Sequence, residues 1–164
     1  MTAAAVVFDL DGTLVCLPVS WEALFEEFKR IMHVEALRPL VDTVSRADER
    51  TRREVFAAWD KAELAIYEGA TSCGEGMRLY RQFAGNPKAL VTLQGRAVVG
   101  LLLEKFELRF DVVVTREDSL FRAEQLRLAA EKLRVPVGDA LFVGNADSDA
   151  AAAQKVGCRF LRVK

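Results

Sequence analysis

The sequence has little of several features that define common protein classes. Its 164 residues include only 3 cysteines and 4 prolines, and 23 basic side chains nearly balance 24 acidic ones. Basic residues form no stripe, so nucleic acid is not expected as a partner. No apolar run approaches the roughly 20 residues that a membrane helix needs, so a membrane is not expected as a partner either.

The cysteines also favour a particular compartment. Cys16, Cys73 and Cys158 are far apart and form no Cys-x-x-Cys pair. An odd number of cysteines without a secretion signal indicates reduced thiols and predicts a cytoplasmic location. The apolar N-terminal stretch lacks basic residues and runs directly into Asp9, which is typical of a core strand rather than of a signal peptide.

What the sequence does contain is a regular alternation of apolar and amphipathic segments. Apolar residues make up 51% of the chain, as expected for a globular protein. We predict strands at residues 3–8, 89–92, 110–114, 140–143 and 159–163, and helices at 75–84, 97–107, 122–133 and 149–156. This alternation predicts an α/β fold with a Rossmann-like parallel sheet and helices on both faces.

The segment from residue 16 to residue 69 has a different character. Its apolar residues recur at helical spacing and it contains no convincing strand, so we predict three helices. The chain is therefore expected to have a core of residues 1–15 and 70–164. A small helical cap of residues 16–69 would be inserted after the first strand.

Polar side chains follow the predicted central strands. Asp9 and Asp11 come after the first strand, Thr92 ends the second, and Asn145 and Asp149 follow the fourth. The carboxyl ends of parallel strands share one edge of a sheet, where α/β proteins bind ligands. The residue types predict a site for a metal ion and a phosphate.

Three segments resemble motifs of the haloacid dehalogenase superfamily of hydrolases, and in particular its phosphoglycolate-phosphatase-like members. Residues 7–15, Val-Phe-Asp-Leu-Asp-Gly-Thr-Leu-Val, match the first motif in full. Residues 90–92 are similar to the second motif, and residues 141–149 are similar to the fourth. The helical segment lies where this family inserts its cap.

The resemblance implies a Mg²⁺-dependent phosphatase that hydrolyses a small phosphorylated metabolite. Asp9 would attack phosphorus to form an aspartyl-phosphate, and Asp11 would act first as general acid and then as general base. The resemblance also implies sites for phosphate and metal. Phosphate would be bound by Gly12, Thr92, Leu93 and Arg122, and Mg²⁺ by Asp9, Asp11, Asn145 and Asp149.

Two positions depart from the family pattern. The fourth motif normally begins Gly-Asp, but here it is Gly144-Asn145, which removes a negative charge and predicts weaker Mg²⁺ affinity. The lysine of the third motif is absent from residues 115–124. Arg122 is the first candidate to replace it and Arg116 the second, because arginine carries a permanent charge and can bind phosphate bidentately.

The sequence is also compatible with other functions. A scaffold that binds phosphate or a protein partner with weakened turnover would explain Asn145 and the missing lysine. A carbon–halogen hydrolase is disfavoured because those members lack the second acid, which Asp11 supplies. A phosphotransferase would differ only in the group that accepts the phosphoryl. The protein is expected to be a monomer or a homodimer.

Overall fold

A computed structural model describes residues 2–164. In chain order its strands are β1 (Ala5–Asp9), β2 (Val15–Cys16), β3 (Thr71–Ser72), β4 (Lys88–Val91), β5 (Val112–Val114), β6 (Ala140–Gly144) and β7 (Arg159–Arg162). Its α-helices are α1 (Trp21–Met32), α2 (Leu40–Arg46), α3 (Glu49–Ile66), α4 (Gly74–Gln82), α5 (Arg96–Lys105), α6 (Arg122–Leu133) and α7 (Asp147–Val156). No helix in residues 2–164 has the length and hydropathy to cross a membrane.

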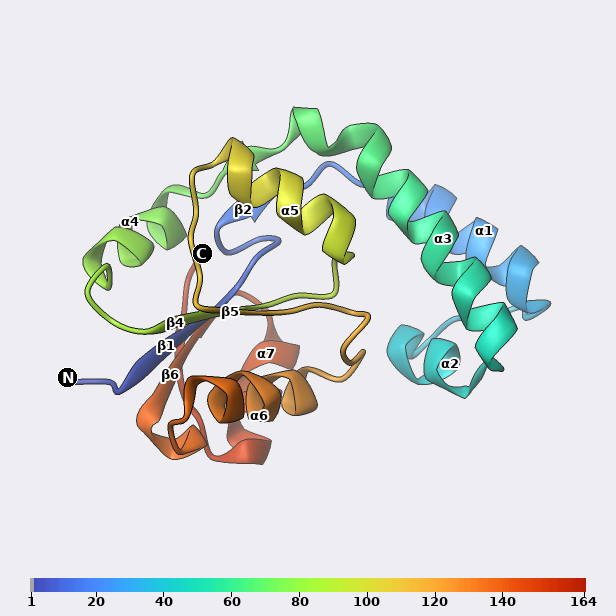
Figure 1. The fold of residues 1–164 in the computed structure, drawn as a ribbon. Coiled ribbons are helices and arrows are strands. Elements are labelled where there is room, and N and C mark those ends of the chain that lie inside the picture. The colour runs from blue at the N-terminus through green and yellow to red at the C-terminus, as the bar shows by residue number, and fades with distance from the viewer. Residues whose placement is uncertain (1) are drawn as a thin grey trace.

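The centre of the molecule is a five-stranded parallel sheet in the order β5-β4-β1-β6-β7. Helices α4 and α5 lie on one face, and α6 and α7 lie on the other (Figure 1). Successive side chains of β1 point to opposite faces of the sheet, as β geometry requires. Val6 and Phe8 pack with α4 and α5, whereas Val7 packs with α6 and α7. The predicted parallel α/β fold with helices on both faces is confirmed.

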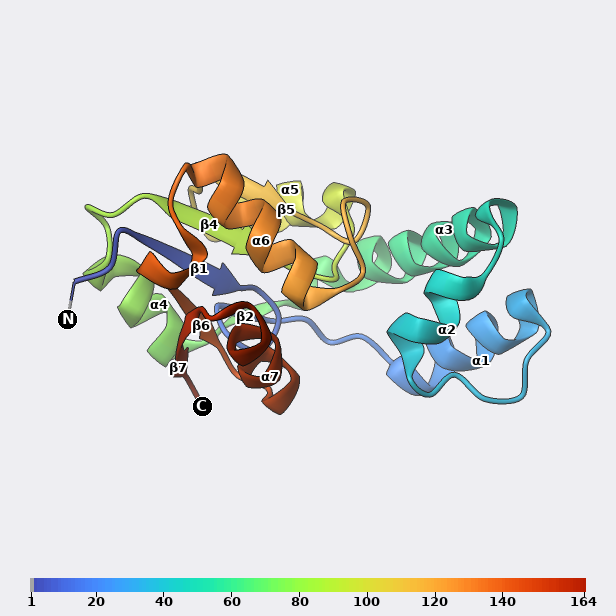
Figure 2. The same cartoon turned by 90° about the horizontal axis from the view of Figure 1, so that it is seen from below.

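Helices α1, α2 and α3 form a helical block that extends from the carboxyl edge of the sheet (Figure 2). Trp59 and Phe28 are completely buried at its centre, with ring centroids 5.4 Å apart. Leu93 and Leu120, from the loops after β4 and β5, pack into the same apolar cluster. The block therefore shares its core with the loops that surround the site. The division at residues 16 and 69 stays a prediction.

A short two-stranded ribbon was not predicted from the sequence. β2 and β3 pair antiparallel, with Val15 opposite Ser72 and Cys16 opposite Thr71. This ribbon carries both connections between the sheet and the helical block. Two-residue strands are too short to produce a recognisable alternation, so no pattern in the sequence predicted them.

Candidate active site

The candidate site is built around the carboxylate of Asp9. β1 is completely buried between β4 and β6, and Asp9, its last residue, is only 4% exposed. Burial raises the pKa of Asp9 to about 7, while the Arg122 guanidinium opposes this shift and the Asp149 carboxylate adds to it. The fold thus places a carboxylate in a dry position with one cation beside it.

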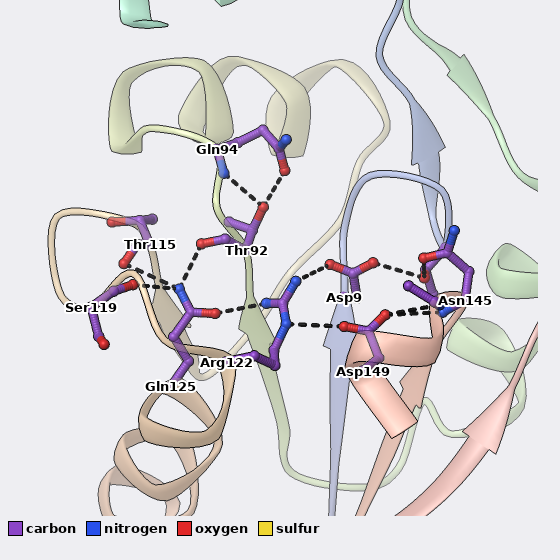
Figure 3. A network of polar contacts seen from close by, with 11 residues as sticks. Asp9, Thr92, Gln94, Thr115, Ser119, Arg122, Gln125, Asn145 and Asp149 are labelled. Atoms are coloured by element: carbon purple, nitrogen blue, oxygen red, sulfur yellow. Dashed lines mark hydrogen bonds and ion pairs between the residues drawn. The ribbon is translucent and has the colours of Figure 1, made fainter. Parts of the chain in front are cut away.

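That cation is Arg122, the first residue of α6. Its Nη2 donates to Asp9 Oδ1 at 2.9 Å, and its Nε donates to Asp149 Oδ1 at 3.1 Å. Its Nη1 donates to Gln125 Oε1 at 2.7 Å (Figure 3). The guanidinium is held on three sides, and one of its contacts is the carboxylate predicted to be the nucleophile.

Arg116, the alternative candidate, faces the helical block. Its Nη1 donates to Glu63 Oε1 at 2.8 Å and to the Leu93 carbonyl at 3.0 Å, and its Nη2 pairs with Asp60. The guanidinium carbon lies 4.4 Å from the centroid of a Trp59 ring. Arg116 is completely buried in these contacts, which leaves Arg122 as the arginine that reaches Asp9.

Asp11 and Gly12 shape the turn after β1. Asp11 Oδ1 accepts a hydrogen bond from the Leu17 N–H at 2.9 Å, and burial raises the pKa of Asp11 while that hydrogen bond opposes the rise. Gly12 has a φ of +84°, and a Cβ there would overlap the Asn145 side chain. The Gly12 N–H donates to the Val15 carbonyl at 2.7 Å. In this structure Gly12 therefore allows the turn and the close approach of Asn145.

Replacing Gly12 with Ala should lower the free energy of unfolding by about 1–2 kcal/mol, because a side chain is disfavoured at this φ and must displace Asn145. Gly100→Ala is the matched control. Gly100 lies within α5 and a Cβ there meets nothing within 4 Å, so this variant should be about 1 kcal/mol more stable than wild type. Equal effects of the two substitutions in urea unfolding would contradict this assignment.

Two side-chain oxygens from different motifs converge beside Thr13. The Thr13 hydroxyl lies 3.1 Å from Asp9 Oδ2 and 3.4 Å from Asn145 Oδ1. Oxygen atoms of this kind are the ligands that Mg²⁺ prefers. Asp9 and Asn145 therefore fit a Mg²⁺ site, although Asn145 brings no charge.

Asp149 is engaged differently from its predicted role as a metal ligand. Its Oδ2 accepts from the backbone N–H groups of Asn145 and Ala146 at 3.2 and 3.1 Å, while Oδ1 accepts from Arg122. A Cβ at Gly144 would lie 2.7 Å from Asp149 Oδ2, so glycine there permits this fit. Within residues 2–164, no group of three or more His, Cys, Asp or Glu side chains could hold a metal ion. The contacts favour Asp149 as a residue that fixes the start of α7 and positions Arg122.

The predicted phosphate-binding loop after β4 is held internally. The Thr92 hydroxyl accepts from the Gln94 N–H at 3.1 Å and also bonds to the Gln94 side chain. The Thr92 carbonyl accepts from Gln125 Nε2 at 2.8 Å, and Gln125 also bonds Arg122. Thr92 is thus linked through Gln125 to Arg122, Asp9 and Asp149 (Figure 3).

Sequence reasoning missed Gln125, which is completely buried. A signal was available, because Gln125 lies one position before the buried Leu126 and three after Arg122, on the inward face of an amphipathic helix. A polar residue at such a position needs partners. Here it joins the loops after β4 and β5 to α6, since it also donates to the Ser119 carbonyl at 2.8 Å.

Arg122→Lys should lower the free energy of unfolding by about 1–3 kcal/mol, although it keeps the charge. A single ammonium cannot reproduce the fork that reaches Asp9, Asp149 and Gln125 together. Arg127→Lys, on an exposed position of the same helix, should change stability by less than about 0.5 kcal/mol. An Arg122→Lys protein as stable as the Arg127→Lys protein would argue against this network.

Comparison with known proteins identifies the family. The family model of haloacid dehalogenase-like hydrolases matches residues 6–163, nearly the whole chain. The chain belongs to this family. The hydrolase therefore has the fold and the family that its first motif predicts. A comparison with curated protein sequences gives no match.

Solved structures show the same fold at low sequence identity. A haloacid dehalogenase-like hydrolase from Streptococcus pneumoniae has a TM-score of 0.71 and 17% identity, with 99% of this chain and 85% of that chain covered. CbbY from Rhodobacter sphaeroides, solved in complex with phosphate, has a TM-score of 0.69 and 18% identity, with 97% of this chain and 85% of that chain covered. A Lactobacillus plantarum protein with a proposed phosphoglycolate phosphatase activity has a TM-score of 0.66 and 23% identity, with 98% of this chain and 86% of that chain covered.

Proposed function

We propose that this hydrolase is a Mg²⁺-dependent phosphatase that cleaves small phosphomonoesters through an aspartyl-phosphate. The observation that carries the proposal is the buried Asp9 carboxylate with the Arg122 guanidinium 2.9 Å away, at the carboxyl edge of a parallel sheet. A nucleophilic carboxylate and a phosphate dianion repel one another. A fixed cation at the point where they meet lowers that barrier.

Each acid of the first motif has a separate task in this proposal. Asp9 attacks phosphorus, and Arg122 neutralises the charge shared by the carboxylate and the phosphoryl oxygens. Asp11 is only partly buried and is anchored by the Leu17 N–H through one oxygen. Its other oxygen can protonate the leaving group and then take a proton from the hydrolytic water.

Magnesium would be held by the Asp9 carboxylate, the Asp11 backbone carbonyl and the Asn145 amide oxygen. When bound, the ion supplies positive charge that screens the phosphate from Asp9. Asn145 is neutral and Asp149 is engaged with Arg122 and two backbone N–H groups. We therefore expect a lower Mg²⁺ affinity than an aspartate at position 145 would give.

The substrate we propose is a small phosphorylated metabolite. We propose that the protein itself is cytoplasmic and is a monomer or a homodimer. The near-neutral charge of −1 supports neither nucleic acid nor an anionic membrane surface as substrate. The helical block lies beyond the carboxyl edge of the sheet (Figure 2), and Asp9 ends β1 at that edge.

Replacing Asp11 with Asn tests the proposed acid–base step. Loss of a general acid should slow the cleavage of alkyl phosphates by about 10²-fold or more. Cleavage of p-nitrophenyl phosphate should slow less, because p-nitrophenolate leaves without protonation. The measurement is kcat/KM for both esters, with Mg²⁺ and with EDTA. Equal losses for the two esters would contradict the role of Asp11.

A phosphate-binding scaffold with weakened turnover is the second candidate. It is favoured by Asn145 and by the engagement of Asp149 with Arg122. A scaffold should bind inorganic phosphate in calorimetry but hydrolyse no ester of a broad panel faster than an Asp9→Asn control. An enzyme should turn over at least one ester with Mg²⁺ and lose that turnover in the control.

A further inference from the structure

Two thiols meet where the chain passes between the sheet and the helical block. Cys16 ends β2 and Cys73 directly follows β3, and the antiparallel pairing continues as the Cys73 N–H donates to the Leu14 carbonyl at 2.8 Å. Cys16 and Cys73 therefore lie on the same face of the ribbon as diagonal neighbours. Their sulfur atoms are 2.9 Å apart.

We propose that Cys16 and Cys73 form a reversible intramolecular disulfide when the protein meets a hydroperoxide. A disulfide requires a sulfur–sulfur distance of about 2.05 Å, so the two atoms need to approach by only about 0.9 Å. Cys16 is exposed and an oxidant can reach it, whereas Cys73 is half-buried. Transient, redox-responsive disulfides are the kind found in reducing compartments.

The exposures assign the order of the two steps. The Cys16 sulfur attacks the hydroperoxide, the O–O bond breaks, and Cys16 becomes a sulfenic acid while an alcohol or water leaves. The Cys73 sulfur then attacks the Cys16 sulfur, the S–O bond breaks, and hydroxide leaves with the Cys73 proton as water. Two thiols are oxidised by two electrons and one hydroperoxide is reduced.

Cys73 is suited to the second step rather than to the first. Burial raises the pKa of its thiol to about 12, with further contributions from Cys16 and from the charges of Asp11 and Asp9. The thiolate is the reactive form of cysteine, so Cys73 reacts slowly with an external oxidant. Once Cys16 is oxidised, the short distance between the sulfurs compensates for this low reactivity.

The bond would enclose residues 17–72 and join both connections to the helical block. It would also act on Asp11, because Cys16 lies between Val15, which bridges to Asp11, and Leu17, whose N–H binds the Asp11 carboxylate. Drawing Cys16 toward Cys73 shifts this hydrogen bond. We expect oxidation to lower phosphatase activity by at least about tenfold, and this consequence rests on the proposed function.

The test compares wild type with Cys16→Ser, Cys73→Ser and the control Cys158→Ser, because Cys158 is buried beside the Ala140 carbonyl, away from the pair. Each full-length protein is treated with hydrogen peroxide. Its free thiols are counted, and its peptides are mapped by mass spectrometry without reduction. Wild type and Cys158→Ser should each lose two thiols, yield a Cys16–Cys73 linked peptide and recover both thiols with dithiothreitol. Thermal unfolding should occur at a higher temperature for the oxidised than for the reduced wild type.

Three results would overturn the proposal. They are a disulfide-linked dimer through Cys16, a Cys73 that stays titratable while Cys16 is oxidised, and the same thiol loss in Cys73→Ser as in wild type. Thiol counts and mapped peptides do not depend on catalysis, so they remain decisive if no phosphatase activity is found. A linked protein with unchanged phosphatase activity would overturn only the coupling to Asp11.

Discussion

Replacing Asp9 with Asn should lower kcat/KM for phosphomonoester hydrolysis by about 10⁴-fold or more, as expected when a covalent nucleophile is removed. The amide keeps the shape of the side chain but cannot form the acyl phosphate. The free energy of unfolding should stay close to that of wild type, because burial disfavours the charged form of Asp9 and raises its pKa to about 7. The measurement is steady-state kinetics on a panel of esters, together with urea unfolding of the same protein.

Asp147→Asn is the matched control for this substitution. Asp147 begins α7 close to the site in sequence, but its side chain is fully exposed and pairs with Arg162 at the surface. Its removal should leave kcat/KM within about twofold of wild type. An Asp147→Asn protein as inactive as Asp9→Asn, or an active Asp9→Asn protein, would contradict the account.

The second large effect is expected at Arg116. Arg116→Met should lower the free energy of unfolding by about 3–5 kcal/mol at pH 8, because it leaves the buried Glu63 without its cation. Glu63 Oε1 would keep only the Gly95 N–H at 3.1 Å, and Oε2 has no hydrogen-bond partner within residues 2–164. Arg127→Met, at an exposed position, should cost less than about 0.5 kcal/mol.

The cost of Arg116→Met should depend on pH. Burial raises the pKa of Glu63 to about 7, while Arg116 opposes this shift, so loss of Arg116 raises that pKa further. A carboxyl whose pKa is higher in the folded state binds more protons there, so its contribution to stability falls as pH rises from about 4.5 through 7. The variant should therefore be closest to wild type near pH 5.

A double variant separates the buried charge from lost packing. Adding Glu63→Gln to Arg116→Met removes the unpaired acid and should recover more than half of the lost stability at pH 8. If Arg116→Met costs the same at pH 5 and pH 8 and Glu63→Gln recovers nothing, the loss comes from packing against Trp59 rather than from charge.

The five core strands were predictable because buried parallel strands are short apolar runs between amphipathic helices. Asp9, Asn145 and Arg122 follow or begin such elements, so their meeting at one edge follows from topology. The sequence could not predict that Asp149 binds Arg122 and two backbone N–H groups. The spacing of residues does not distinguish a metal ligand from a residue that caps a helix.

The choice between the two arginines was not predictable either. Arg116 lies in the loop after β5 and Arg122 is the first residue of α6, only six positions later, so the packing of α3 decides between them. Glu63 and Asp60 lie more than fifty positions earlier and withdraw Arg116 from the site. Contacts of such long range leave no local pattern in one sequence.

The stereochemical course at phosphorus tests the central claim most directly. A phosphorothioate monoester made chiral with ¹⁶O and ¹⁷O is hydrolysed in H₂¹⁸O by the wild-type enzyme with Mg²⁺, and the configuration of the chiral inorganic thiophosphate that forms is determined. Attack by Asp9 followed by attack of water involves two in-line displacements, so the account predicts retention of configuration. Inversion would mean that water attacks the ester directly, and Asp9 would not be the nucleophile.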